Sequence, residues 1–229
     1  MRLLSYGRSG LLVELDSLDE VLRLTAELDA DRPAGVSELI PGARTVLIRF
    51  DPARTGLGPL AAHLARRPAE PIGPPGSAGS AGSAGPIGPA QSERGSDRRG
   101  GGEQVEIPVR YDGPDLAAVA EMTGLSTAEV VRRHSQARYR VAFTGFAPGF
   151  GYLSGGDRAL VVSRRSTPRT RVRAGAVGLA GEFTGVYPRP GPGGWQLIGH
   201  TDVTMWDVDR TPAALLRPGV AVVFRAVSS

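Results

Sequence analysis

The chain has 229 residues, of which 41% are hydrophobic and 22% are charged. This composition supports a buried core, excludes a wholly disordered or fibrous protein, and suits one large or two small domains. The sequence has no cysteine, which excludes disulfides and thiolate metal sites, and all 27 basic residues are arginine. Arginine stays charged near pH 10, where lysine loses its charge, so a modest surplus of arginine is enough to give a high isoelectric point. The isoelectric point is therefore not a sign of nucleic-acid binding, and we expect no such partner.

The chain contains no stretch that predicts a membrane helix, because none of its apolar runs reaches about 18 residues. The first residues also interrupt their apolar run within a few positions. We therefore expect a cytoplasmic protein with no membrane partner.

The first part of the chain predicts a small α/β domain over residues 1–70. Apolar periodicity indicates a strand, a helix, two strands and a helix, over 11–15, 18–28, 36–40, 45–50 and 57–66. Ser17 and Glu20 have the spacing of a capping box at the start of the first helix. The order β, α, β, β, α is typical of a ferredoxin-like domain.

Residues 71–102 consist mostly of Gly, Pro, Ser and Ala and predict a disordered linker. Glycine recurs at every third position from Gly73 to Gly88, but this run is too short and too poor in proline for a collagen helix. A coil of this length spans about 30 Å, so the linker allows the two flanking domains many relative geometries.

The remaining residues, 103–229, predict a second domain. A strand over 104–111 precedes two helices, the second of which begins at a capping box formed by Ser126 and Glu129. Short apolar strands then alternate with Gly/Pro turns, over 139–144, 159–163, 174–180, 195–198, 203–206 and 220–224. Many short strands at this spacing are typical of a closed β-barrel or a sandwich.

Glycine, proline and aromatic residues concentrate in residues 144–153, directly after a predicted strand. Glycines allow a ligand to approach the backbone closely, and aromatic side chains supply flat walls. The stretch fits either a ligand pocket or a tight corner of the barrel.

Five arginines occur within residues 164–173. On a strand, four of them would share one parity and face the same way: Arg165, Arg169, Arg171 and Arg173. Such a cluster would bind a carboxylate or a phosphate through bidentate hydrogen bonds. The alternative is a charged edge that discourages the addition of another strand.

A third stretch, residues 185–201, contains the turn Pro-Gly-Gly-Trp at 192–195. The backbone N–H groups of this turn could face an anion, with Trp195 as a platform. A plain hairpin turn with a tryptophan in the core is the alternative.

The sequence does not identify a general base. His200, Asp202 and Glu182 are candidates for acid-base chemistry, but no spacing supports any of them. A Walker-type phosphate loop ends in Lys, so a chain without lysine cannot contain one. We therefore expect the main site of any ATP to lie on another chain.

Together, the three stretches resemble the signature of the family described as allophanate hydrolase subunit 1, as KipI-like or as the B subunit of 5-oxoprolinase (PxpB). The resemblance covers nearly all of residues 104–225. It implies a small N-terminal α/β domain and a C-terminal cyclophilin-like β-barrel, without prolyl isomerase activity. The expected fold class is therefore α+β, with a ferredoxin-like domain followed by a cyclophilin-like barrel.

The resemblance also implies a shared activity. Members of the family work with a subunit 2 or KipA-like (PxpC) partner. With a lactam-utilisation-type (PxpA) subunit, that complex uses ATP to cleave 5-oxo-L-proline to L-glutamate. The implied protein is a subunit inactive alone, with ATP and Mg²⁺ present only in the assembled complex. Two alternatives are a regulatory module that inhibits a histidine kinase and a subunit associated with allophanate hydrolase or urea carboxylase.

The resemblance assigns substrate or anion binding to Arg169, Arg171, Gly193, Gly194 and Thr201. It assigns the shaping of a pocket to Phe146, Pro148, Gly149, Tyr152, Tyr187 and Trp195. We expect no metal site in this chain. His200 stands where relatives usually have arginine, which weakens anion recognition there because a neutral imidazole cannot form a bidentate pair.

Overall fold

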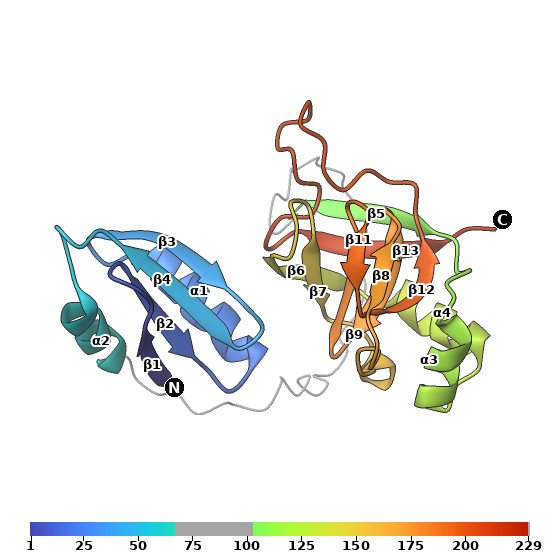
Figure 1. Cartoon of the computed structure of the whole chain (residues 1–229), viewed down its shortest axis with the longest axis horizontal. Coiled ribbons are helices and arrows are strands. Elements are labelled where there is room, and N and C mark those ends of the chain that lie inside the picture. The colour runs from blue at the N-terminus through green and yellow to red at the C-terminus, as the bar shows by residue number, and fades with distance from the viewer. Residues whose placement is uncertain (67–102, 229) are drawn as a thin grey trace, which may run out of the picture.

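A computed structural model describes residues 1–66 and 103–228. The predicted linker over 71–102 lies outside the described residues. The described residues form one hydrophobic core within 1–66 and further cores within 103–228 (Figure 1). The domain boundaries at residues 70 and 103 stay predictions.

The N-terminal unit is a four-stranded antiparallel sheet with two helices packed against it. Its elements are β1 (Arg2–Ser5), β2 (Gly10–Glu14), α1 (Leu18–Ala30), β3 (Val36–Pro41), β4 (Thr45–Phe50) and α2 (Leu57–Ala65). The strand order is β1-β2-β4-β3, so β2, α1 and β3 form a split β-α-β unit around β4. The arrangement is ferredoxin-like, with the outer strand supplied by β1, which the sequence analysis missed.

The C-terminal unit is dominated by a seven-stranded sheet in the order β12-β9-β10-β7-β6-β13-β5, with β8 and β11 forming a separate pair. Its elements are β5 (Gln104–Val109), α3 (Leu116–Thr123), α4 (Thr127–Gln136), β6 (Tyr139–Thr144), β7 (Gly151–Ser154), η1 (Arg158–Leu160), β8 (Arg169–Val172), β9 (Ala176–Ala180), β10 (Phe183–Val186), β11 (Gly191–Gly193), β12 (Gln196–His200) and β13 (Ala221–Ala226). Helices α3 and α4 pack against β12 and β13.

The two ends of this sheet meet at one backbone bridge between Arg110, which follows β5, and His200 at the end of β12. Each residue donates its N–H to the carbonyl of the other, with N to O distances of 2.9 and 2.8 Å. We call this junction the barrel seam. The sheet is therefore closed into a barrel, and the expected cyclophilin-like fold is confirmed.

The serine half of each predicted capping box is present, whereas the Glu20 carboxylate accepts from the Asp16 N–H and the Glu129 carboxylate from Arg132 and Arg133. The Ser17 hydroxyl accepts a hydrogen bond from the Glu20 N–H at 3.3 Å, and the Ser126 hydroxyl accepts one from the Glu129 N–H at 3.1 Å. Since this local geometry is encoded within four residues, the starts of α1 and α4 follow directly from the sequence. None of the helices in residues 1–66 and 103–228 is long and apolar enough to cross a membrane. The cytoplasmic location stays a prediction.

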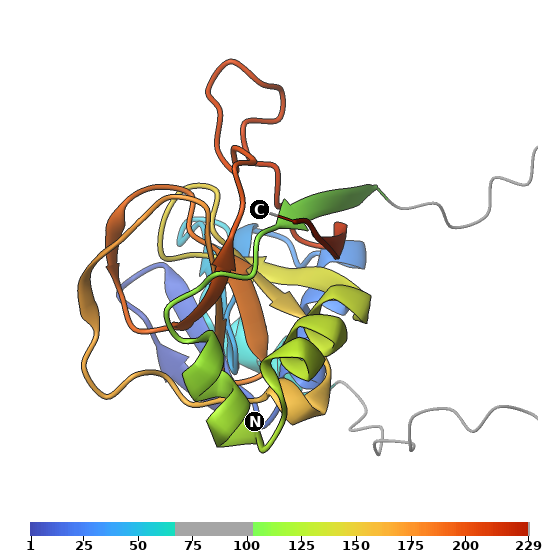
Figure 2. The ribbon, with the colours of Figure 1, turned by 90° about the vertical axis from the view of Figure 1, so that its right-hand side faces the viewer.

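Two predicted strands are wrong. The region 159–163 contains the short helix η1, because the Asp157 carboxylate accepts the Ala159 N–H at 2.9 Å and turns the chain. The region 203–206 belongs to the connection between β12 and β13, which projects from the barrel (Figures 1 and 2). In that region only Trp206 forms a bridge, to Ala214.

The two units contact each other through a small apolar cluster. Leu18 and Leu22 of α1 pack with Phe143 of β6 and Tyr152 of β7. Tyr152 also belongs to a second apolar cluster inside the barrel unit, together with Trp195. One aromatic side chain therefore links the N-terminal unit to the interior of the barrel unit.

Candidate functional site

The three stretches singled out in the sequence meet around one pocket of about 110 Å³. Its lining consists of Phe146, Phe150, Tyr152, Arg164, Tyr187, Gly193, Gly194 and Trp195. We call it the aromatic pocket. Six of these residues are among those that the sequence analysis selected, and Phe150 and Arg164 are additions. Pro148 and Gly149, also selected, lie in the same hairpin outside this lining.

The hairpin between β6 and β7 supplies the rim of the pocket. The Phe150 N–H donates to the Ala147 carbonyl at 3.0 Å and closes the turn. Phe146 has a φ of 65° and is 60% exposed, so its backbone is strained to present an aromatic ring to the surface. Its ring lies 5.3 Å from that of Phe150 and 6.0 Å from that of Tyr187, both edge-on.

Gly149 ties this hairpin to the projecting connection. Its φ is 84°, and a Cβ at this position would lie 2.8 Å from the Cβ of Trp206. Only glycine allows this approach. The base of the projecting connection therefore fixes the hairpin that carries Phe146.

Stacked rings form the back wall. Tyr152 stacks on Phe143 with ring centroids 4.4 Å apart and planes 19° apart. Trp195 meets Tyr152 and Phe150 edge-on, at centroid distances of 5.6 and 5.3 Å. These offset and edge-on contacts are the favourable aromatic geometries, so the wall is rigid.

Tyr187 places a polar group inside this apolar setting. Burial raises the pKa of its hydroxyl, although a hydrogen bond from the Trp195 backbone and the charge of Arg164 act against that rise. The hydroxyl is therefore neutral and keeps its proton for donation. Gly193 packs directly on it, because a Cβ there would lie 2.3 Å from the hydroxyl oxygen.

Beside the pocket, Asp115 gathers two of the arginines. Its side chain is 4% exposed, and its Oδ1 accepts from Arg165 Nη1 at 2.9 Å and from Arg169 Nη2 at 2.7 Å. Its Oδ2 accepts the Leu197 N–H at 2.7 Å. Burial raises the pKa of Asp115, but these hydrogen bonds and charges outweigh it and hold the pKa below its usual range. This carboxylate is therefore charged, and both of its oxygens accept hydrogen bonds from within the chain.

The predicted arginine face does not form. Strand β8 contains only residues 169–172, so Arg165 precedes it and Arg173 follows it. Arg169 is paired with Asp115, Arg171 is exposed, and Arg173 lies 3.7 Å from Asp112. None of the four lines the aromatic pocket. Binding of an anion by Arg169 or Arg171 stays a prediction.

The barrel seam holds a second group of charged residues. His200 Nδ1 lies 2.6 Å from the Asp112 carboxylate, and His200 Nε2 lies 3.4 Å from Arg110 Nη1. Both ring nitrogens of His200 therefore have a neighbouring polar group at the seam. Arg110 also pairs with Asp202 at 2.9 Å. With both ring nitrogens engaged, His200 has no nitrogen free to act as a general base.

The neighbouring groups at the seam are also engaged. Burial raises the pKa of Asp112, but the hydrogen bond and charge of His200 and the charge of Arg173 outweigh it and lower the pKa overall. Thr201 is buried, and its hydroxyl accepts the Val203 N–H at 3.2 Å. Thr201 lies at the seam and not in the aromatic pocket.

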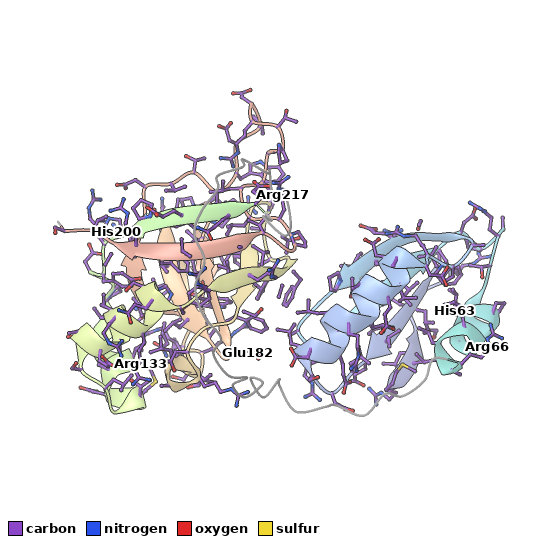
Figure 3. All side chains as sticks on the ribbon, turned by 180° about the vertical axis from the view of Figure 1, so that it is seen from behind. His63, Arg66, Arg133, Glu182, His200 and Arg217 are labelled. Carbon is purple, nitrogen blue, oxygen red and sulfur yellow. The ribbon has the colours of Figure 1, made fainter. Side chains whose placement is uncertain are left out.

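Glu182 lies apart from both groups. It borders a cavity of about 330 Å³ between the barrel and α1, together with Leu18 and Asp19. Figure 3 shows Glu182 on the side of the barrel facing the N-terminal unit, away from His200. The three acid-base candidates are thus not brought together in one site.

His134 of α4 is a core residue. It is fully buried, accepts from the Tyr111 hydroxyl at 2.8 Å through Nδ1, and donates to Thr184 Oγ1 at 3.0 Å through Nε2. Thr184 must accept because its own hydroxyl donates to the Gly178 carbonyl at 3.1 Å. Burial lowers the pKa of His134 to about 3, so it is neutral and structural.

Comparisons with known proteins show the family of this chain. The model of the family described as "Carboxyltransferase domain, subdomain C and D" matches residues 1–216. The B subunit of the 5-oxoprolinase of Escherichia coli O157:H7 is 52% identical over 123 residues, which cover 52% of this chain and 56% of that protein. The match therefore spans about half the length of this curated relative.

Two solved structures extend the comparison. TTHA0988 is 33% identical with a TM-score of 0.67, over 96% of this chain and 40% of that chain. The K. lactis urea amidolyase is 19% identical with a TM-score of 0.66, over 99% of this chain and 15% of that chain, and shows the shared fold alone. The resemblance carried by the three stretches is confirmed, and the chain belongs to the family of carboxyltransferase domains, subdomains C and D.

Proposed function

We propose that this chain is a non-autonomous subunit of an ATP-dependent 5-oxoprolinase complex that cleaves 5-oxo-L-proline to L-glutamate. The observation that carries the proposal is the aromatic pocket, in a chain that is 52% identical over 123 residues to a protein named as the B subunit of a 5-oxoprolinase. The pocket volume of about 110 Å³ is the volume that about four water molecules occupy in liquid water. This size suits a single five-membered ring with a small substituent.

The pocket would position the lactam and stabilise charge. Phe150, Tyr152 and Trp195 offer flat apolar walls to a flat ring, which holds it in one orientation. The neutral Tyr187 hydroxyl would donate a hydrogen bond to the lactam carbonyl oxygen. That bond would strengthen as negative charge develops on the oxygen during attack by water.

The composition of the lining supports dependence on a partner. The described residues that line the pocket include no carboxylate and no imidazole. Arginine cannot act as a base at neutral pH, and the pKa of Tyr187 is raised. We therefore place the general base on a second polypeptide, the subunit 2 or KipA-like (PxpC) protein or the lactam-utilisation-type (PxpA) subunit.

The aromatic pocket does not fit ATP, because a space of about 110 Å³ is far smaller than the several hundred Å³ of sites for larger ligands. We therefore place ATP and Mg²⁺ on the partner subunits. There ATP would supply the activation that ring opening of a stable lactam requires.

The test is co-expression of this chain with both proposed partners, followed by an assay for glutamate released from 5-oxoproline. We expect release that requires ATP and all three chains. A stable complex that releases no glutamate from 5-oxoproline would refute the substrate. Failure of the three chains to assemble would refute the role in this complex.

A further inference from the structure

The charge in the aromatic pocket has a single source. Arg164 is the one charged side chain among the described residues that line the pocket. No carboxylate within residues 1–66 and 103–228 pairs with it. Its charge acts on the Tyr187 hydroxyl, which places the guanidinium near the polar end of the pocket.

The neighbouring arginines are prevented from competing with Arg164. The Asp115 carboxylate engages Arg165 and Arg169 at 2.9 and 2.7 Å. The charges of Arg165 and Arg169 are therefore compensated by one buried carboxylate, and neither residue lines the pocket. Arg171 is exposed and outside the lining.

The backbone that carries Arg164 is fixed on both sides. The Arg165 N–H donates to the Gly194 carbonyl at 2.8 Å, and the Gln196 side-chain amide donates to the Ser163 carbonyl at 3.0 Å. The two partners are the chain neighbours of Trp195, which lines the pocket between β11 and β12. The backbones that carry Arg164 and Trp195 are therefore held together, which limits where the guanidinium can lie before a ligand binds.

We propose that Arg164 is the specificity-determining residue of the aromatic pocket and that it binds the carboxylate of a small cyclic amide acid. This inference rests on the proposed function and deepens it. A guanidinium recognises a carboxylate through two parallel hydrogen bonds. With the ring held by the aromatic walls, this pair would fix which end of the lactam faces Tyr187, and would select against the same ring without a carboxylate.

The first measurement is made on the full chain alone, so that it does not depend on turnover. The sequence contains two tryptophans, Trp195 and Trp206. In a Trp206→Phe background, fluorescence reports on Trp195 only. We expect 5-oxoproline to change this emission, and Arg164→Gln to weaken its Kd by about 10- to 100-fold, the range for a hydrogen bond to a charged group.

A control ligand and a matched control variant sharpen the titration. The ligand 2-pyrrolidinone has the same ring without the carboxylate, so its Kd should be unchanged in Arg164→Gln. Arg189→Gln removes another exposed arginine, two positions after Tyr187, and should leave both ligands unaffected. Thermal unfolding followed by circular dichroism verifies that each variant is folded.

The second measurement uses the assembled complex. We expect Arg164→Gln to lower kcat/KM for 5-oxoproline by about 10- to 100-fold and to leave any turnover of 2-pyrrolidinone unchanged. Equal losses for both ligands, or a loss in Arg171→Gln with none in Arg164→Gln, would overturn the assignment. If the complex is inactive but the titration shows the Arg164 dependence, the proposed function fails and the carboxylate site stands. If the emission of Trp195 does not respond to 5-oxoproline, the site is refuted.

Discussion

The aromatic pocket and the barrel seam both contain arginine, yet they differ in how the charge is used. At the seam, Arg110 is paired with Asp202, and Asp112 is engaged by His200 and Arg173. In the pocket, Arg164 faces aromatic rings without a carboxylate among the described residues. The seam residues hold the ends of the sheet together, whereas the pocket keeps a charge for a ligand.

The comparison shows that residue type alone does not mark a site. His200, Asp202 and Thr201 are typical catalytic or binding residues, but each of them is engaged within the seam. Arg164 is one of five arginines within ten residues. Arg164 and Arg171 both lack a carboxylate partner in the part of the chain that the structure describes, and Arg164 differs in that it lines the aromatic pocket.

The largest effect should come from the carboxylate that separates the arginines. Asp115→Ala removes the partner of Arg165 and Arg169, and breaking a buried pair in this way costs about 3 to 5 kcal/mol. Urea unfolding followed by tryptophan fluorescence measures this loss, because both tryptophans lie in the barrel unit.

A matched control for that variant is Glu106→Gln. Glu106 pairs with Arg225, but the two side chains are 55% and 58% exposed, so the loss should stay below about 1 kcal/mol. Equal losses of stability in the two variants would mean that the buried pairs of Asp115 contribute no more than an exposed ion pair. The contrast between Asp115 and the exposed pairs at the seam would then fail.

The next effect concerns Gly193, which lines the pocket and packs on the Tyr187 hydroxyl. Gly193→Ala would place a Cβ 2.3 Å from the Tyr187 hydroxyl oxygen, so the hydroxyl must move. A displacement of this kind should lower the activity of the assembled complex on the order of 100-fold. Gly191→Ala is the control, because nothing lies within 4 Å of its added Cβ. Full activity in Gly193→Ala would show that the position of Tyr187 does not matter.

The third effect is a pH dependence from His134, a buried polar group whose partners are all present. Its pKa is about 3 in the folded chain and about 6.5 when unfolded, so the unfolded chain binds the proton first as pH falls. Stability is full above pH 6.5 and declines towards pH 3. Between pH 7 and pH 5 we expect a loss of about 2 kcal/mol.

The pH dependence can be assigned by removing the titrating group. The variant His134→Gln lacks an imidazole. Its free energy of unfolding should therefore depend less steeply on pH over this range, because about one proton fewer binds on unfolding. Urea unfolding at pH 7, 6 and 5 provides the comparison. An unchanged slope in the variant would show that another group is responsible.

The smallest effect is expected at the seam. His200→Gln should reduce stability by less than about 1 kcal/mol, because its partner Asp112 is 54% exposed and the backbone bridge to Arg110 remains. Urea unfolding measures this difference. A loss above about 3 kcal/mol would show that the His200 side chain is needed to close the barrel. The seam would then contribute as much to the free energy of unfolding as Asp115 does.

Features encoded over a few residues were predictable from the sequence. The serine caps at Ser17 and Ser126 lie in the structure where the spacing places them. The pocket residues Tyr152, Tyr187 and Trp195 were selected through the resemblance, and they meet in one lining. Strand β1 was missed because Arg2–Ser5 is short and its pairing with β2 supplies much of its stability.

Features that depend on distant residues were not predictable. Asp115 pairs with arginines that lie 50 and 54 positions away and with the N–H of Leu197, 82 positions away. Without that pairing, parity on a hypothetical strand favoured Arg169 and Arg171 over Arg164. The signal that could have identified Arg164 is three-dimensional, since it depends on which guanidinium groups already have a carboxylate and on which of the remaining ones lines the pocket.

The closed sheet of the barrel also bears on how the chain behaves when it is concentrated. At the seam, the outer edge of β12 is covered, because His200 pairs with Arg110 and the carbonyls of Ile198 and Leu197 accept the N–H groups of Gly113 and Asp115. In the N-terminal sheet, β1 and β3 each have a single neighbour among the described strands. These edges carry Arg2, Glu38 and Pro41, and charge and proline discourage edge-to-edge aggregation. Protection against aggregation therefore comes from coverage of the β12 edge in the barrel unit and from edge composition in the N-terminal unit.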